Sequence, residues 1–419
     1  MTKVYDQDYA IRQVSSSSAG GLVIDAHVDV LGNMINASST VGANPPTQVY
    51  QYDSLYRLTA SQTGATPPVP LESYSYGKTG DRTSVALNGA SATAYAYTPG
   101  THRLQSVGGA TRNYDAAGNT QSLNGATLTY DARNRLASVT GSVSATYTYN
   151  GKGERASKAV GGVTTTFLYG EGGQLLGEYA NGNVQEYLYL DGTLVGVAYA
   201  TAASPVGQLY YVETDHLGTP RVVIQPGATP SADVVLWKWD FFGSAFGTNQ
   251  PSVQGLNLRF PGQYFDSETG LNYNYFRDYE PGTGRYVESD PIGLRGGINT
   301  YAYVKGNSLK YADPEGLEGY GSWTYCYQDG SPGPCAWDPH NSSYSGWEVC
   351  YAPVEGRPGS CLGETWLTCT DDCGNKHRYR YIKICTSAFS GGGVSFGNVT
   401  GMSGKDCKDP TRYEGPFLE

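Results

Sequence analysis

The chain of 419 residues is poor in several residue types that common protein classes need. Only 16% of its residues are charged, and it has 3 Met and 10 Phe against 36 Tyr and 56 Gly. Tyr, Thr and Val favour strands, whereas Gly, Asn and Asp favour tight turns. The composition therefore predicts an all-β protein, in a chain long enough for two or three domains.

Long apolar runs and a basic surplus are also missing. No stretch of about 18 apolar residues occurs, so we expect no transmembrane segment, and the N-terminus has no apolar core typical of a secretory signal. The net charge of −10 argues against a general nucleic-acid binder, which needs a basic face. Either the protein stays inside the cell, or a signal-independent machinery exports it.

Cysteine is absent from residues 1–317, whereas residues 318–419 contain all 8 cysteines of the chain. Such a step marks a domain boundary near residue 317. An even number of cysteines at this density is typical of a disulfide scaffold in an oxidising compartment. Bound metal and free thiols are the alternatives, although we expect neither a metal nor another cofactor. The pairing is left open among Cys326, Cys335, Cys350, Cys361, Cys369, Cys373, Cys385 and Cys407.

A short phrase recurs through the cysteine-free part of the chain at intervals of about 16–24 residues. Two clear copies are Tyr114-Asp115-Ala116-Ala117-Gly118 and Tyr130-Asp131-Ala132-Arg133-Asn134. The fifth position is Gly or Asn in every clear copy, and weaker copies open at Tyr52 and Tyr97. Restarting one phrase in this way favours a repeat architecture over the alternative, an ordinary β-sandwich.

The fifth position of the phrase predicts a turn, because Gly and, less often, Asn accept a positive φ at little cost. The preceding Asp or Asn bonds backbone amides within such a turn, and flanking segments such as 145–149 alternate as strands do. Each copy is thus a hairpin, and the hairpins must stack because one alone cannot bury its face. Tyr suits such a sheet, since its ring packs while its hydroxyl faces water.

These phrases resemble the YD repeats of RHS proteins, teneurins and the C component of insecticidal Tc toxins. A more specific resemblance, to the RHS repeat-associated core domain, runs from Tyr211-Val212-Glu213-Thr214-Asp215 to Asp313-Pro314-Glu315-Gly316-Leu317. It implies YD/RHS repeats over 1–209 that spiral as β-hairpins into a hollow or partial shell. The core would occupy 210–317, and a small, variable, Cys-rich tip would occupy 318–419.

Two phrases of the form Asp-Pro-x-Gly-Leu begin at Asp290 and Asp313. By residue type alone each phrase predicts a β-turn. The family resemblance implies more: the core cuts its own chain after the last such phrase, with Asp290 and Asp313 as the catalytic pair and Leu317-Glu318 as the scissile bond. Two close carboxylates cannot both ionise, so one keeps a proton while the other activates water. Arg285 is an accessory candidate, with a surface arginine as the alternative.

The tip gives few chemical signals of its own. His340 and His377 are candidates for a nuclease-like or phosphotransfer site, against a loop histidine and a basic strand as the alternative. By resemblance, the tip is a toxin freed by self-cleavage for interbacterial competition or host attack, with an immunity protein and a secretion machinery as partners. The resemblance also implies a protein that is cytoplasmic before export and is then secreted or delivered by a signal-independent secretion system, and we expect no nucleic acid to bind the shell. The alternatives are a surface or adhesion repeat protein with a disulfide-bonded binding tip, and a displaced, inactive cassette.

Overall fold

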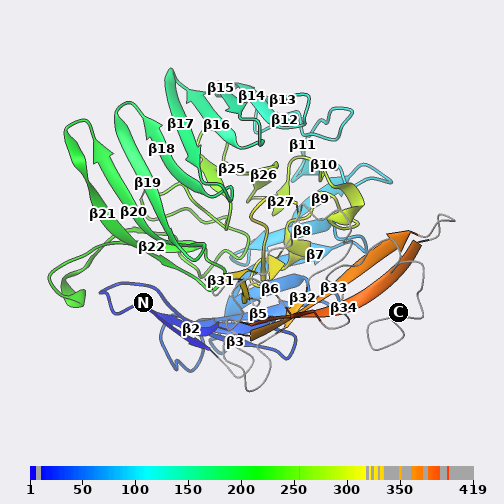
Figure 1. Ribbon diagram of the computed structural model, residues 1–419. Helices are drawn as coiled ribbons and strands as arrows, with labels where there is room; N and C mark the ends of the chain where they lie inside the picture. The colour runs from blue at the N-terminus through cyan, green and yellow to red at the C-terminus, as the bar shows by residue number, and fades with distance from the viewer. Residues whose placement is uncertain are drawn as a thin grey trace. The chain divides into compact units, whose positions relative to one another are not determined.

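The computed structural model describes residues 1–5, 11–253 and 255–317, and of 318–419 only the backbone of the strands. Up to Ser322 the described residues form one compact unit, and the strands from residue 323 on belong to a second. Two long antiparallel sheets make up most of the first unit (Figure 1). The first sheet has eleven strands in sequence order: β1 (Thr2–Tyr5), β2 (Ile11–Ser15), β3 (Val23–Val28), β4 (Met34–Ser38), β5 (Gln48–Tyr52), β6 (Leu58–Thr63), β7 (Pro70–Tyr76), β8 (Arg82–Leu87), β9 (Thr93–Tyr97), β10 (Leu104–Val107) and β11 (Ala110–Thr111).

The second sheet continues the same up-and-down order over twelve strands. Because each strand pairs with its neighbours in sequence, every connection is a hairpin, as the repeat predicts. All-β architecture from stacked hairpins is thereby confirmed. The strands are β12 (Ser122–Leu123), β13 (Ala126–Tyr130), β14 (Leu136–Gly141), β15 (Ala145–Tyr149), β16 (Arg155–Val160), β17 (Val163–Tyr169), β18 (Leu175–Ala180), β19 (Asn183–Leu190), β20 (Thr193–Thr201), β21 (Ser204–Thr214), β22 (Pro220–Gln225) and β23 (Val234–Lys238).

A smaller four-stranded sheet follows in the chain and packs against the buried face of the repeats. Leu271 and Val287, from the segment that resembles the RHS core, lie in one apolar cluster with Leu128, Leu136 and Val139 of the second sheet. The core elements are β24 (Tyr264–Asp266), β25 (Leu271–Asn274), β26 (Arg277–Glu280) and β27 (Arg285–Tyr286), then β28 (Tyr311–Ala312) paired with β29 (Tyr320–Gly321). Three short 3-10 turns complete the unit: η1 (Pro230–Ala232), η2 (Gly293–Arg295) and η3 (Val304–Gly306).

The tip is described by its strand backbones alone. One hairpin joins β30 (Tyr325–Gln328) to β31 (Ser331–Pro334), and a four-stranded sheet contains β32 (Val349–Tyr351), β33 (Ser360–Thr370), β34 (Lys376–Thr386) and β35 (Val394–Ser395). The register of β33 and β34 sets Cys361 opposite Cys385 and Cys369 opposite His377. No helix among the described residues is long and apolar enough to span a lipid bilayer.

The turn geometry of the repeat follows the predicted chemistry. The fifth position has a positive φ in copy after copy, for example 96° at Gly118, 60° at Asn134 and 95° at Gly153. The Asp131 side chain accepts hydrogen bonds from the backbone N–H groups of Arg133 and Arg135, at 2.8 and 3.0 Å. At the first residue of the phrase the strand register shifts, so each turn begins with a bulge.

Four of the tyrosines that open a copy direct their hydroxyl groups to protein carbonyls, so for these residues the expectation of a hydroxyl facing water is wrong. Tyr130 donates to the carbonyl of Thr120 and Tyr149 to that of Leu136, both at 2.7 Å. Tyr52 and Tyr97 make the corresponding bonds in the first sheet. A buried hydroxyl needs a partner, and the backbone of the preceding hairpin supplies one. Each of these four tyrosines therefore ties its own hairpin to the one before it.

Two glycines of a single turn provide a matched test of this geometry. Gly153→Ala should lower the free energy of unfolding by about 1–2 kcal/mol, since Ala must adopt the left-handed conformation there. Gly151→Ala should change it by less than about 0.5 kcal/mol, because a Cβ at Gly151 meets no atom within 4 Å and φ is ordinary. Urea unfolding of both variants measures the difference, and equal losses would contradict a positive-φ requirement at the fifth position.

Candidate functional site: two aspartates around a buried arginine

Arg277 is the centre of the candidate site, and a tight turn fixes its position. It opens β26, where it pairs with Asn274 at the end of β25, and Tyr275 in the turn between them has a φ of 57°. The Arg277 guanidinium lies 3.6 Å from the centre of the Tyr286 ring, and the side chain is almost fully buried. Because arginine stays charged under all ordinary conditions, this buried cation needs anionic partners.

Both candidate aspartates supply those partners. Arg277 Nη2 lies 3.1 Å from Asp290 Oδ2 and 3.3 Å from Asp313 Oδ2. Both carboxylates are buried, with 7% and 2% of each residue exposed. The structure thus brings the first residues of the two Asp-Pro-x-Gly-Leu phrases together on one guanidinium.

The β-turn interpretation is confirmed for the first phrase, which begins at Asp290. The Asp290 carbonyl accepts from the N–H of Gly293 at 2.9 Å, and its Oδ1 accepts from the N–H of Ile292 at 2.9 Å. One oxygen of the carboxylate therefore stabilises its own turn, while the other faces Arg277. The turn therefore holds the Asp290 side chain in place beside Arg277.

Asp313 is held by several donors. Its Oδ2 accepts from the Tyr286 hydroxyl at 2.7 Å, its Oδ1 accepts from the Leu317 N–H at 2.9 Å, and its carbonyl accepts from Asn274 Nδ2 at 2.8 Å. Burial raises the pKa of Asp313, and Arg277 together with the Tyr286 hydrogen bond opposes that rise. The carboxyl group is therefore fixed in orientation and more basic than an exposed aspartate.

The chain just before the expected cleavage point packs closely against the core backbone, and two glycines permit this approach. Arg277 Nε donates to the Gly316 carbonyl. A Cβ on Gly316 would overlap the Asn274 carbonyl, and a Cβ on Gly262 would overlap that of Pro314. These close backbone approaches fix the path of the last phrase against the core sheet.

Gly296 lies next to both Asp290 and the carbonyl group of Leu317. A Cβ at Gly296 would overlap Asp290 Oδ2 and would lie 2.9 Å from the Leu317 carbonyl oxygen. The two oxygens therefore lie beside the same small space. Leu317 ends the fully described part of the chain, and Glu318 lies outside the described residues, as do the side chains of His340, His377 and all the cysteines.

Arg285 lies elsewhere in the core. It is buried, with 6% of the residue exposed, so the surface alternative is wrong. Its guanidinium donates to the His102 carbonyl and lies 5.2 and 4.8 Å from the ring centres of Tyr97 and Tyr301. Arg277 occupies the position between the aspartates that the sequence analysis considered for Arg285. One feature of the sequence could have pointed to Arg277: the charged pair Arg277-Asp278 stands among aromatic residues, and charges within a buried strand need partners.

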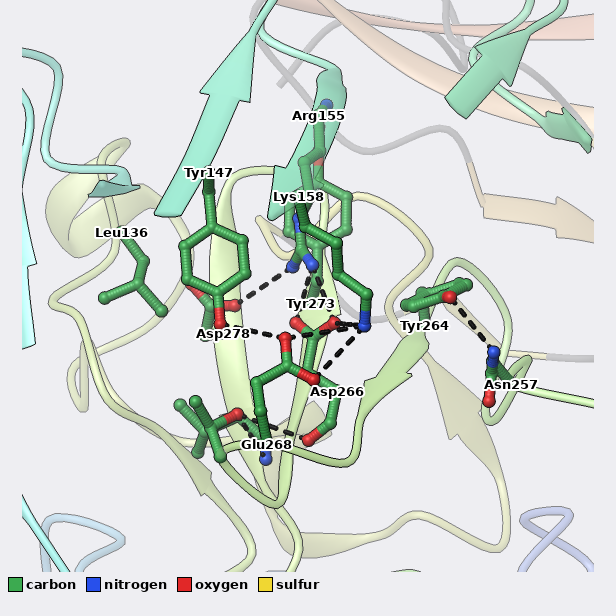
Figure 2. A network of polar contacts seen from close by, with 12 residues as sticks. Leu136, Tyr147, Arg155, Lys158, Asn257, Tyr264, Asp266, Glu268, Tyr273 and Asp278 are labelled. Carbon is green, nitrogen blue, oxygen red and sulfur yellow. Dashed lines mark hydrogen bonds and ion pairs between the residues drawn. The ribbon is translucent and has the colours of Figure 1, made fainter. Parts of the chain in front are cut away.

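A second buried network anchors the core sheet to the repeats (Figure 2). Arg155 of β16 lies 2.6 Å from Asp266 and 3.6 Å from Asp278, and 3.9 Å from the centre of the Tyr273 ring. Lys158 adds contacts of 3.0 Å to Asp266 and 3.2 Å to Glu268. Sequence reasoning did not find this network, which joins residues more than a hundred positions apart.

The network meets the candidate site at Asp278, next to Arg277. The backbone N–H of Asp278 donates to Glu288 Oε2 at 2.8 Å, so two carboxyl groups lie together in the interior. Burial raises the pKa of Asp278 to about 7, and Arg155 opposes this rise. Burial and the neighbouring Asp278 also raise the pKa of Glu288. This pair therefore holds at least one proton at mildly acidic pH.

The raised pKa of Asp278 predicts how stability depends on pH. In the unfolded chain Asp ionises near pH 4, whereas folded Asp278 keeps its proton up to about pH 7, so the free energy of unfolding falls as pH rises through this window. Asp278→Asn should flatten the slope, by up to about 1.4 kcal/mol per pH unit. Asp191→Asn, at an exposed hairpin turn, is the control and should keep the slope. Identical slopes in urea unfolding across the window would contradict the assignment.

Several known proteins are similar to this chain. The profile of the teneurin YD-shell family matches residues 3–303. The chain is 38% identical over 125 residues to double-stranded DNA deaminase toxin A of Burkholderia cenocepacia, a match to 28% of this chain and 8% of the relative. It is 38% identical over 112 residues to toxin protein Tse5 of Pseudomonas aeruginosa, covering 26% of this chain and 8% of that protein.

Solved structures show the same fold. The Tc holotoxin pore of Photorhabdus luminescens superposes with a TM-score of 0.57 at 19% identity over 75% of this chain and 17% of that chain. The crystal structure of TcdB2-TccC3 gives a TM-score of 0.56 at 18% identity, over 75% of this chain and 18% of that chain. This chain spans less than a tenth of the length of both toxin relatives. With a family match over most of its length, an all-β hairpin fold and a specific RHS-type core, the chain belongs to the teneurin YD-shell family of RHS/YD-repeat proteins.

Proposed function

We propose that residues 1–317 are the shell and self-cleaving core of an RHS-type polymorphic toxin, which hydrolyses its own Leu317–Glu318 bond. The observation that carries the proposal is the contact of one buried guanidinium with both aspartates and with the Gly316 carbonyl, one residue before the bond. A turn without chemical purpose does not require two buried carboxylates on one cation, which is costly unless geometry and pairing are good.

The chemistry divides between the two acids. Asp290 Oδ2 lies beside the same space as the Leu317 carbonyl oxygen, so the Asp290 carboxyl group would donate a hydrogen bond to that oxygen when it carries the proton that the two acids share. Asp313, ionised and oriented by Tyr286 and Arg277, would take a proton from the attacking water. One water is consumed, the C–N bond breaks, Leu317 gains a carboxylate and Glu318 leaves as an amine. Arg277 would compensate the charge that both acids share.

Cleavage is tested by denaturing gels of the purified whole chain. The wild-type chain should run as two fragments, whereas Asp290→Asn and Asp313→Asn should each leave one full-length band, because neither carboxyl acts alone. Arg277→Met should also block cleavage, and Arg285→Gln should not. Asp191→Asn, at an exposed hairpin turn, serves as the control and should cleave normally. Full-length wild-type protein on such a gel would refute the proposal.

Gly296 separates the geometry from the acids in the same assay. Its φ is −74°, which Ala also adopts, yet a Cβ would intrude between Asp290 and the Leu317 carbonyl. Gly296→Ala should therefore slow cleavage strongly in a folded protein. Gly282→Ala adds a Cβ that meets nothing within 4 Å and should leave cleavage unchanged. Equal rates for both variants would place the scissile carbonyl elsewhere.

We infer that residues 318–419 are the released toxin, delivered by a secretion machinery and neutralised by an immunity protein. Support comes from the position of these residues after the last Asp-Pro-x-Gly-Leu phrase and from the names of two relatives, both of which are toxins.

We also propose a disulfide between Cys361 and Cys385. Directly opposed residues of an antiparallel pair have Cα separations of about 4.5–5.5 Å, within the range that a disulfide requires.

The tip proposal predicts toxicity that depends on the compartment. Bacteria producing the whole chain should stop growing, whereas bacteria producing residues 1–317 should not. If disulfides are required, periplasmic production should be toxic and cytoplasmic production harmless. Normal growth with the whole chain in both compartments, at equal protein levels, would contradict a bactericidal tip while leaving the cleavage proposal intact.

A further inference from the structure

A small cavity lies between the first repeat sheet and the core, away from the two aspartates. Its walls include Arg82 of β8, Arg285 of β27, Tyr76, Tyr97 and Asn299. It offers about 20 Å³ for the centre of a water-sized particle. This volume accommodates one water molecule or one ion of similar size, and no larger group fits entirely within it.

Arg82 is a cation that its protein neighbours leave incompletely bound. It is buried, with 5% of the residue exposed, and its guanidinium lies 4.4 Å from the Tyr74 ring centre and 4.1 Å from that of Phe246. Its Nε has no hydrogen-bond partner among the described residues, and neither has the hydroxyl of Tyr76. Aromatic faces attract a cation but do not replace the hydrogen bonds that a guanidinium loses on burial.

Arg285 brings a second cation to the same cavity. Its described contacts are a carbonyl and two aromatic rings, none of which carries a full negative charge. Carboxylates in this part of the chain are already engaged: Asp81 binds His102 and Asn299, each at 2.9 Å, and Glu280 pairs with Arg112. The cavity is therefore lined by two guanidinium groups whose described neighbours are uncharged.

Gly284 permits this arrangement. A Cβ there would overlap the Arg82 guanidinium, and the residue has a φ of 66°. The turn between β26 and β27 thus lets the cation reach the core backbone, although no acidic residue meets it there among its described contacts. A buried, unpaired cation is costly, and arginine cannot relieve the cost by losing its proton.

We propose that this cavity binds one small inorganic anion of halide size between Arg82 and Arg285. The anion supplies the negative charge that the protein does not, and the Tyr76 hydroxyl and Arg82 Nε supply donors. The site joins the first repeat sheet to the core, so occupancy stabilises the packing of one on the other. The inference is independent of the self-cleavage proposal.

Crystals of the whole chain, grown with bromide as the only small anion, test the site directly. An anomalous difference peak between the two guanidinium groups is expected, because bromide scatters anomalously and water does not. A peak without anomalous signal at this position, in crystals that show bromide elsewhere, would identify water and overturn the proposal.

Thermal unfolding provides a second test in solution. Replacing gluconate by chloride at constant ionic strength should raise the Tm of the wild-type chain in a saturable manner. Arg285→Gln should lose this response, and so should Arg82→Met if it folds. The control Arg103→Gln, outside the cavity lining, should keep it. An equal chloride response in Arg285→Gln and the wild type would refute a specific site.

Discussion

Arg277 is a buried cation. Around it lie Asp290, the last Asp-Pro-x-Gly-Leu phrase, which begins at Asp313, and the core sheet. Its Nη2 meets both carboxylates, its Nε meets the Gly316 carbonyl, and its face covers the Tyr286 ring. Removing Arg277 would leave two buried carboxylates without their cation, which is far more costly than losing a surface ion pair. This requirement explains why two turns distant in sequence must meet, and why the chain then passes so close to the core backbone.

The repeat sheets serve as the scaffold for this meeting. Positive-φ turns fix the register of the hairpins, and the hydroxyl groups of Tyr52, Tyr97, Tyr130 and Tyr149 tie their hairpins to the preceding ones. The resulting wall presents Arg155 and Lys158 to Asp266, Asp278 and Glu268 of the core. Because Asp278 is the neighbour of Arg277, the anchoring network and the candidate site share one strand. Rigid support of this kind is what a reacting group needs for accurate orientation.

Sequence predicted the parts of the fold that depend on local chemistry. The turn at Gly153, the strands around it and the all-β class all follow from residue type and spacing. Tyr56 marks the limit of that reasoning, since it has a φ of 60° at the fifth position of a weak copy, where neither Gly nor Asn is present. There the surrounding hairpin imposes the conformation, and propensity alone does not reveal it.

The candidate site was predicted only in part, because contacts between residues distant in sequence determine the rest of it. Asp290 and Asp313 were recognisable by their phrases, whereas Arg277 and the Asp278–Glu288 pair depend on contacts between strands that no local spacing encodes.

Self-cleavage is tested most directly by synthesising the chain in water enriched in oxygen-18 and measuring intact and peptide masses after denaturation. We expect a fragment that ends at Leu317 with one heavy oxygen in its new carboxylate. An undivided chain of 44.8 kDa, or a fragment ending at another residue, would contradict this expectation.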